Sequence, residues 1–210
     1  GLMKKLHRYR DNQRAGKWLD EGTVSTFIGA SVLVVGLGDI GREFAKRANA
    51  LGAKVTGIKR TPGICPEYVE RLYTLDKLDD CLPCADIVFL SLPDTPITKG
   101  LMGKERLARM KKGAILLNAG RGTAVNTEAL CDAVESGHLS GAGLDVIDPE
   151  PLPEGHRAWK IRDIFLTPHV SGYFHLPYTH DRIVDICAEN LRRFFTGEPL
   201  QHIVNRKEGY

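Results

Sequence analysis

The hydrophobic pattern of the chain alternates between short apolar runs and longer amphipathic stretches. Runs rich in Val, Ile and Leu suit strands that are buried on both faces. The strands we predict cover residues 32–35, 54–58, 86–92, 114–118, 141–146 and 164–167. Helices are predicted over residues 75–84, 104–110 and 126–136, the last with Asn126 as its N-cap. Helices alternating with buried strands indicate an α/β fold with a doubly wound, mostly parallel sheet.

Residues 31–60 carry the most informative pattern. An apolar strand leads into Gly36-x-Gly38-x-x-Gly41, and a helix ended by Gly52 precedes the next strand. We expect one face of this helix to carry Ile40, Phe44, Ala48 and Leu51. A strand, glycine turn, helix and parallel strand within about thirty residues are typical of a dinucleotide-binding unit of Rossmann type.

Each glycine of this turn has a physical role. Gly36 permits the tight turn, Gly38 lets the backbone approach a pyrophosphate, and Gly41 lets the helix pack closely on the strand. The amides around Asp39 and Ile40 lie at a helix N-terminus, which favours an anion. Glycine-rich turns are common, so the prediction depends on the strand before the motif and the helix after it.

The two ends of the chain differ from this pattern. Residues 1–20 predict a helix whose basic cluster we interpret as a solvated face, and residues 21–175 form the predicted dinucleotide-binding domain. Residues 176–210 predict a helix over 178–196, ended by Gly197, and a tail. We interpret its apolar stripe as packing; the stripe comprises Ile183, Ile186, Cys187, Asn190, Leu191 and Phe194.

Composition changes this picture little. With 42% hydrophobic and 26% charged residues, the 210-residue chain can build an ordinary globular core. A net charge of +3 is too small to indicate nucleic acid or an anionic membrane as a partner. No apolar run has the length of a membrane span and no signal-like segment opens the chain, so we expect a cytoplasmic protein.

The five cysteines show no disulfide framework. Cys81-x-x-Cys84 has the spacing of a metal or redox pair, but the second pair that would complete a zinc site is missing. We interpret these cysteines as reduced packing thiols and predict no metal site; a metal or redox role is the alternative.

Polar residues follow four of the predicted strands at their carboxyl ends. In a doubly wound sheet these ends lie on one edge, where ligands bind. We therefore expect the residues that follow the strands to line a binding site. On the cofactor side these are Pro93, Thr95, Ala119 and Asp145.

The motifs VVGLGDIG, LLNAGRG, GAGLDVIDPEPLP and LTPHVSG occur in this order. In these motifs the chain resembles the nucleotide-binding lobe of the D-isomer-specific 2-hydroxyacid dehydrogenases. The resemblance extends from about Arg8 to Tyr210. The resemblance implies a catalytic set of Arg121, Glu150 and His169, and a nicotinamide-binding role for Asp145. It also implies a homodimer, and a second, substrate-binding lobe that is largely absent, with remnants in residues 1–20 and 176–210.

The chemistry of a 2-oxo acid reduction fits these three residues. Histidine titrates near neutral pH, so His169 is the candidate proton donor and, in reverse, the acceptor. A carboxylate such as Glu150 can stabilise the protonated imidazole through its other nitrogen. Arg121 offers a planar fork of donors for the substrate carboxylate. The identity of the 2-hydroxy acid is not predicted.

The residues after the 54–58 strand indicate which nicotinamide cofactor binds. An NAD site usually has Asp or Glu about twenty residues past the glycines. Here Lys59, Arg60 and Thr61 occupy that position, and they suit a 2′-phosphate. We therefore predict NADP(H) in preference to NAD(H), which stays possible.

Other functions remain open at this point. A relative of formate or phosphite dehydrogenases, a corepressor-like sensor that binds NAD(P)(H) without efficient turnover, and a degenerate structural subunit are the alternatives. The set of Arg121, Glu150 and His169 favours an enzyme, and the intact glycines argue against a structural subunit. Of the 210-residue chain alone we expect cofactor binding with feeble turnover or none.

Overall fold

The computed structural model describes residues 1–172, 177–204 and 206. Its contacts divide the chain into two units, Gly1–Thr167 and Pro168–Tyr210, and each is described by itself. The predicted boundary between residues 175 and 176 lies within residues 173–176, which are outside the described residues.

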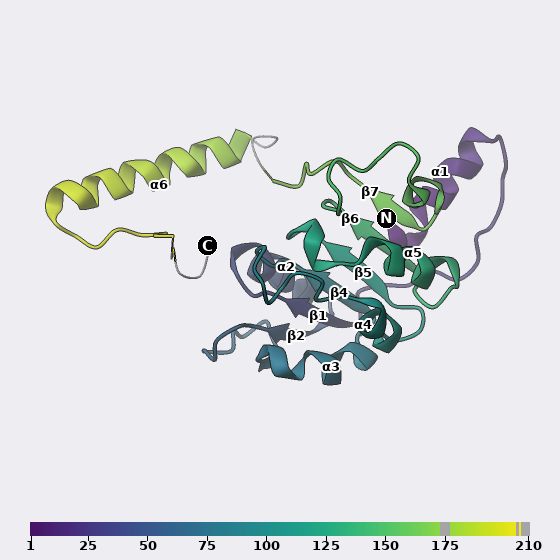
Figure 1. The fold of residues 1–210 in the computed structure, drawn as a ribbon, viewed down its shortest axis with the longest axis horizontal. Coiled ribbons are helices and arrows are strands. Elements are labelled where there is room, and N and C mark those ends of the chain that lie inside the picture. Colours follow the sequence, from purple (N-terminus) through teal and green to yellow (C-terminus); the bar gives the residue numbers. More distant parts are fainter. Residues whose placement is uncertain (173–176, 205, 207–210) are drawn as a thin grey trace. The chain divides into compact units, whose positions relative to one another are not determined.

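The first unit is built on a seven-stranded sheet whose strand pairs are all parallel (Figure 1). Its order is β3-β2-β1-β4-β5-β6-β7, which confirms the predicted doubly wound fold. The strands are β1 (Ser31–Val35), β2 (Lys54–Ile58), β3 (Arg71–Tyr73), β4 (Ile87–Leu90), β5 (Ile115–Asn118), β6 (Gly141–Leu144) and β7 (Ile164–Leu166). The pattern did not predict β3, because this short edge strand opens on a charged residue and lacks an apolar run.

Helices and 3-10 turns connect these strands. They are α2 (Asp39–Ala50), η2 (Leu75–Lys77), α3 (Leu78–Cys81), η3 (Leu82–Cys84), α4 (Lys104–Arg109), η4 (Gly122–Ala124), α5 (Thr127–Glu135) and η5 (Arg157–Lys160). The predicted N-cap is confirmed, since Asn126 accepts a hydrogen bond from the Ala129 amide at 2.9 Å.

The sheet is buried on both faces. In β1, Val32 and Val34 belong to one hydrophobic cluster with Ala45 of α2. Leu33 and Val35 belong to the other cluster, which contains Leu78, Leu107 and Leu130 from α3, α4 and α5. Alternate side chains of one strand therefore fill two different cores, as a doubly wound sheet requires.

The predicted apolar face of α2 is wrong at both ends. Ile40 and Leu51 are 59% and 56% exposed, whereas Gly41, Ala45 and Ala48 are buried. The helix lies so close to the sheet that small residues fill the contact. Half-buried Phe44 completes it, with its ring stacked on Phe89 at 3.9 Å between centroids.

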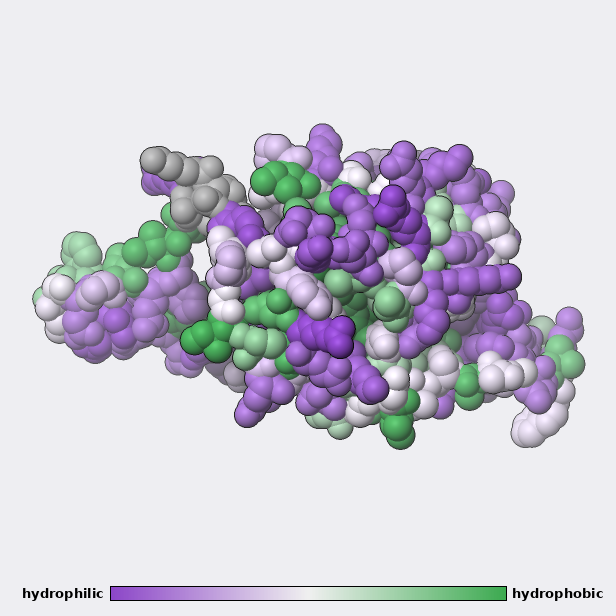
Figure 2. Space-filling view, turned by 90° about the horizontal axis from the view of Figure 1, so that it is seen from below, coloured by the Kyte–Doolittle hydropathy of each residue, from purple (hydrophilic) through white to green (hydrophobic). Residues whose placement is uncertain are grey.

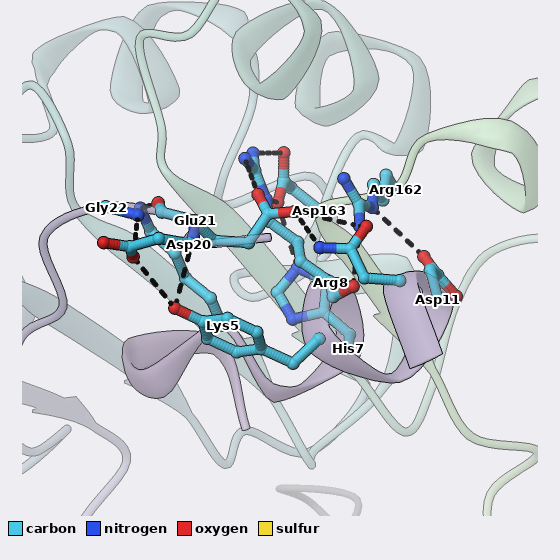
Figure 3. Close-up of polar contacts among 11 residues, drawn as sticks. Lys5, His7, Arg8, Asp11, Asp20, Glu21, Gly22, Arg162 and Asp163 are labelled. Carbon is cyan, nitrogen blue, oxygen red and sulfur yellow. Dashed lines mark hydrogen bonds and ion pairs between the residues drawn. The ribbon is translucent and has the colours of Figure 1, made fainter. Parts of the chain in front are cut away.

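The basic N-terminal segment is more than a solvated face (Figure 3). It forms η1 (Leu2–Lys4) and α1 (Leu6–Arg14). In α1, the Arg8 guanidinium donates to both carboxylate oxygens of Asp163 at 2.8 and 2.6 Å. Arg8 also contacts Glu21 at 3.3 Å, and His7 lies 3.0 Å from Asp163. The segment is thus tied to the residue that immediately precedes β7.

The second unit contains the predicted C-terminal helix, α6 (Pro177–Thr196), and Gly197 follows it with φ 73°. The interpretation of its apolar stripe as packing is wrong for the described residues. None of the helix's described residues is buried, and Leu191 and Phe194 are largely exposed. An amphipathic helix needs an apolar surface to pack on, and α6 is the one helix or strand among the described residues of this unit.

The cysteines also differ from their interpretation as packing thiols. All five are free, but only Cys131 is buried. Cys81 is half-buried, and Cys65, Cys84 and Cys187 are exposed. The packing interpretation therefore holds for Cys131 and fails for Cys84.

Hydrophilic residues cover much of the surface seen from below, and hydrophobic ones form smaller patches (Figure 2). Within the described residues, no helix combines the length and the apolarity that a membrane span requires.

Candidate functional site

The glycine turn is held between the carboxyl ends of two strands. The Gly36 amide donates to the Ile58 carbonyl of β2 at 2.9 Å, and its own carbonyl accepts from the Ser91 hydroxyl at 2.7 Å. Gly36 has φ 98°, and a Cβ there would lie 2.6 Å from the Ser91 carbonyl oxygen. Only glycine fits this position without moving the backbone.

Gly41 and Gly38 differ in what surrounds them. A Cβ on Gly41 would lie 1.9 Å from the Gly36 oxygen, so this glycine brings α2 against the turn. A Cβ on Gly38 would meet no atom within 4 Å. Gly38 is the N-cap of α2 and supplies no side-chain cap, while Asp39 in the first turn bonds to Arg42 at 2.6 Å. The first-turn amides therefore border open space that suits an anion.

The cationic segment Lys59, Arg60 and Thr61 follows β2 directly. The Lys59 amide donates to the Tyr73 carbonyl of β3 at 2.9 Å. The side chain of Lys59 is half-buried, whereas Arg60 and Thr61 are exposed. Because Ile58 is bonded to Gly36, this segment begins next to the glycine turn.

A threonine pair shapes the loop after β4. Thr98, 8% exposed, donates through its hydroxyl to the Pro93 carbonyl at 2.6 Å and accepts from the Thr95 amide at 2.9 Å. The two threonine hydroxyls are 2.9 Å apart. Thr98 was not predicted, although a Thr-x-x-Thr spacing after a strand is a signal for such a turn.

The loop after β5 is organised by Asn118, which is 2% exposed. Its amide donates to the Arg121 carbonyl at 3.0 Å, and its oxygen accepts from the Gly120 amide at 3.1 Å. Ala119 bonds to Leu90 of β4 through its amide, and Arg121 is exposed. Asn118 was not predicted either; its signal is an amide that ends an apolar strand.

The loop after β6 packs against the Arg121 loop. A Cβ on Gly122 would lie 2.1 Å from the Ile147 oxygen, so the two backbones are in close contact. Buried Thr127 donates to the Asp148 carbonyl at 2.6 Å, two residues before exposed Glu150. No sequence pattern singled out Thr127.

Asp145 directly follows β6 and is 8% exposed. Its carboxylate accepts from the Thr167 hydroxyl at 2.6 Å. His169 comes two residues after Thr167 but belongs to the second unit, where its backbone is left-handed with φ 54°. The first unit thus gathers the other predicted residues at the carboxyl edge of its sheet, and His169 is described with the second unit.

The described residues contain no group of three His, Cys, Asp or Glu side chains arranged to hold a metal ion. What the edge offers is an uncapped helix N-terminus, a cationic segment, an exposed guanidinium and a buried carboxylate. These groups can bind an elongated anionic ligand by its phosphates and orient a small acid beside it.

Comparison with known proteins identifies the chain. Residues 1–171 match the family "D-isomer specific 2-hydroxyacid dehydrogenase, NAD binding domain". The chain is 39% identical over 194 residues to D-3-phosphoglycerate dehydrogenase of Mycobacterium leprae, covering 91% of this chain and 36% of that protein. It is 36% identical over 205 residues to glyoxylate reductase of Pyrococcus horikoshii, covering 92% and 59%. The chain spans between 33% and 59% of the length of the curated relatives it matches.

Two solved structures are similar along nearly the whole chain. One is a D-isomer specific 2-hydroxyacid dehydrogenase of Xanthobacter autotrophicus in complex with NADPH and MES. It is 36% identical, has a TM-score of 0.84, and is matched over 99% of this chain and 84% of that one. The other is an NADPH-dependent glyoxylate/hydroxypyruvate reductase of Sinorhizobium meliloti in complex with NADP and sulfate. It is 28% identical with a TM-score of 0.87, matched over 99% and 65%.

Proposed function

Because the chain belongs to the D-isomer-specific 2-hydroxyacid dehydrogenases, in their NAD-binding domain, we propose that it binds a nicotinamide dinucleotide at the carboxyl edge of its sheet. There it serves hydride transfer between that cofactor and a 2-oxo or D-2-hydroxy acid. The observation that carries the proposal is the open space at Gly38 beside the uncapped first turn of α2. In this assignment the amides of Asp39 and Ile40 hold the pyrophosphate, and Asp145 holds the nicotinamide carboxamide.

We assign the cofactor preference to Lys59, Arg60 and Thr61. They follow the strand whose last residue is bonded to the glycine turn, at the place where an NAD site carries an acidic residue. Two cations and a hydroxyl complement a 2′-phosphate and leave a ribose 2′-hydroxyl without its usual acceptor. NADP(H) is therefore the proposed cofactor, and NAD(H) the weaker ligand.

The proposed reaction divides the remaining work among three side chains. The bound cofactor supplies or accepts the hydride. Arg121 binds the substrate carboxylate through its guanidinium, and Asn118 fixes the backbone on either side of it. His169 donates a proton to the carbonyl oxygen, or removes it from the hydroxyl in reverse. Glu150 stabilises the protonated imidazole.

Calorimetric titration with NADPH and, separately, NADH tests the cofactor assignment. We expect tighter binding of NADPH, and we expect Lys59→Asp to reverse the preference. Lys112→Asp, an exposed charge at the opposite edge of the sheet, serves as the control and should leave the preference unchanged. Binding of neither cofactor would contradict the dinucleotide site, and an unmoved preference in Lys59→Asp would contradict the role of this segment.

Turnover is tested separately, with glyoxylate and hydroxypyruvate as 2-oxo acids and NADPH oxidation as the readout. His169→Asn should lower kcat by at least about a hundredfold, the range expected of a general acid, while the affinity for NADPH stays the same. A rate of NADPH oxidation that His169→Asn leaves unchanged would contradict the role of His169 as proton donor.

A further inference from the structure

A cavity lies at the amino edge of the sheet, where β1, β2 and β3 begin, opposite the carboxyl edge of the proposed dinucleotide site. It has a volume of about 390 Å³, and its lining includes Ser31, Lys54 and Arg71 from these strands, with Cys81 and Cys84 from the helical segment. The glycine turn lies at the other end of β1, so this cavity is separate from the proposed dinucleotide site. Its volume is within the range that holds small organic ligands.

Two cysteines line the same cavity. Cys81 ends α3 and Cys84 ends η3, and the backbone at Cys81 and Leu82 is right-handed helical. Residues three apart in a helix are neighbours on its surface. Both thiols are free, Cys84 is exposed, and Cys81 is half-buried. Exposed Cys84 is thus positioned to react first and Cys81 to react second.

The electrostatic surroundings support that order. Burial raises the pKa of the Cys81 thiol and the charge of Asp80 acts in the same direction, against the opposing charges of Lys77 and Arg71. Cys81 is therefore kept protonated more than an ordinary thiol. The more accessible Cys84 is the better candidate for the attacking thiolate.

Some of the charged side chains that line the cavity are not paired with one another. Lys54 and Arg71 form no ion pair or side-chain hydrogen bond with any residue that the structure describes, and the same holds for the Glu70 carboxylate. Lys77, in contrast, pairs with Asp80 at 3.1 Å. Two cations and one carboxylate are left to meet a ligand. They complement a small molecule that carries two carboxylates and one ammonium group.

We propose that this cavity is a thiol–disulfide exchange site for a small disulfide whose halves each carry two carboxylates and an ammonium group, as in oxidised glutathione. The Cys84 thiolate attacks one sulfur, which forms a mixed disulfide and releases one small thiolate. The Cys81 thiolate then displaces the second small thiolate and forms a Cys81–Cys84 disulfide. The two protein thiols lose two electrons and two protons as they form the disulfide. The small disulfide gains them and is reduced to two thiols.

The first experiment treats the reduced protein with oxidised glutathione and follows each cysteine by peptide mass spectrometry. Cys84 should gain the glutathionyl group faster than Cys65 and Cys187, two other exposed cysteines that serve as internal controls. Cys81→Ser should trap the mixed disulfide on Cys84, whereas the unaltered chain proceeds to the Cys81–Cys84 disulfide. Equal rates at the three exposed cysteines, or a stable adduct on Cys84 in the unaltered chain, would overturn the proposal.

The second experiment separates recognition from simple exposure. Reversing both unpaired cations, in Lys54→Glu with Arg71→Glu, should slow the reaction of Cys84 with oxidised glutathione by roughly tenfold through lost electrostatic attraction. The reaction with uncharged 2-hydroxyethyl disulfide should keep its rate, and an unchanged circular dichroism spectrum shows that the variant is folded. Equal slowing with both disulfides, or no slowing with either, would contradict a charge-matched site. None of these outcomes depends on dinucleotide binding.

Discussion

At the scale of single residues, two glycines of one motif are required for different reasons. Gly41 is required by the fold, because its missing Cβ is what lets α2 approach the Gly36 carbonyl. A Cβ on Gly38 would meet no atom of the chain within 4 Å, so the missing Cβ matters only to a ligand. The motif alone cannot make this distinction, which depends on the neighbours that the fold supplies.

Replacing each of these glycines with alanine should therefore give different results. Gly41→Ala should lower the free energy of unfolding by about 3 kcal/mol, since a backbone oxygen has to move. Gly38→Ala should change it by less than about 0.5 kcal/mol and weaken NADPH binding instead. Urea denaturation and calorimetry measure the two effects, and Gly155→Ala, in open space, is the control. A stable Gly41→Ala variant would contradict the close-packing argument.

Asn118 is a residue that the pattern of apolar runs did not single out. Its two hydrogen bonds close the loop that carries Arg121, and they become visible only when the strand is known to be buried. Thr127 is a similar case, because it bonds to the Asp148 carbonyl, which the fold brings near. Strand ends could be located from the sequence, but the buried polar partners that shape the loops could not.

Removing the Asn118 amide should destabilise the protein. Asn118→Ala leaves a buried Gly120 amide without its acceptor, which should cost about 1–3 kcal/mol of the free energy of unfolding. Exposed Asn49 on α2 is the control, and Asn49→Ala should cost less than about 0.5 kcal/mol. Equal urea midpoints for the two variants would show that the loop is held by other contacts.

At the scale of elements, the apolar runs predicted the central strands to within two residues at each end, while amphipathic patterns predicted helix position better than helix orientation. In α2 the largest apolar side chains at the ends lie outside, because small residues form the contact with the sheet. The N-terminal basic cluster was similarly misjudged, since its main partner, Asp163, is far away in sequence. Contacts between distant segments set these details.

The pairing of α1 with the residue before β7 predicts a pH-dependent contribution to stability. Burial opposes the charge of Asp163, but hydrogen bonds from Arg8 and His7 outweigh it and lower the pKa of the carboxyl. Asp163→Asn should therefore cost about 1–2 kcal/mol at neutral pH. Because the pKa of Asp163 is lower in the folded state, its carboxylate stabilises the fold fully above the unfolded-state pKa, which is about 3.9. This stabilisation is lost as the pH falls through the folded-state pKa.

The difference in the free energy of unfolding between the unaltered chain and Asp163→Asn should accordingly shrink in acid. Urea denaturation over a pH series measures it, and Glu43→Gln is the control because its pair with Arg47 is exposed on one helix. That control should cost less than about 0.5 kcal/mol at any pH. A destabilisation by Asp163→Asn that grew as the pH fell would contradict a lowered pKa of Asp163 in the folded state.

At the scale of the whole molecule, both hydrophobic clusters lie within Gly1–Thr167, and no described residue of α6 is buried. A chain that ends at Thr167 should thus unfold cooperatively in urea at the same midpoint as the full chain. A midpoint lower by a clear margin would show that the second unit contributes to the core. Circular dichroism should record the lost helix of residues 177–196.

The close contact at Gly122 also has a meaning for protein engineering. With the backbone of one loop seated against Ile147 and Asp148 of the other, neither loop can change length or course by itself. Chimaeras between relatives should therefore exchange residues 118–150 as a single cassette, together with α5 between the loops. Libraries that diversify one loop alone would sample mostly misfolded combinations.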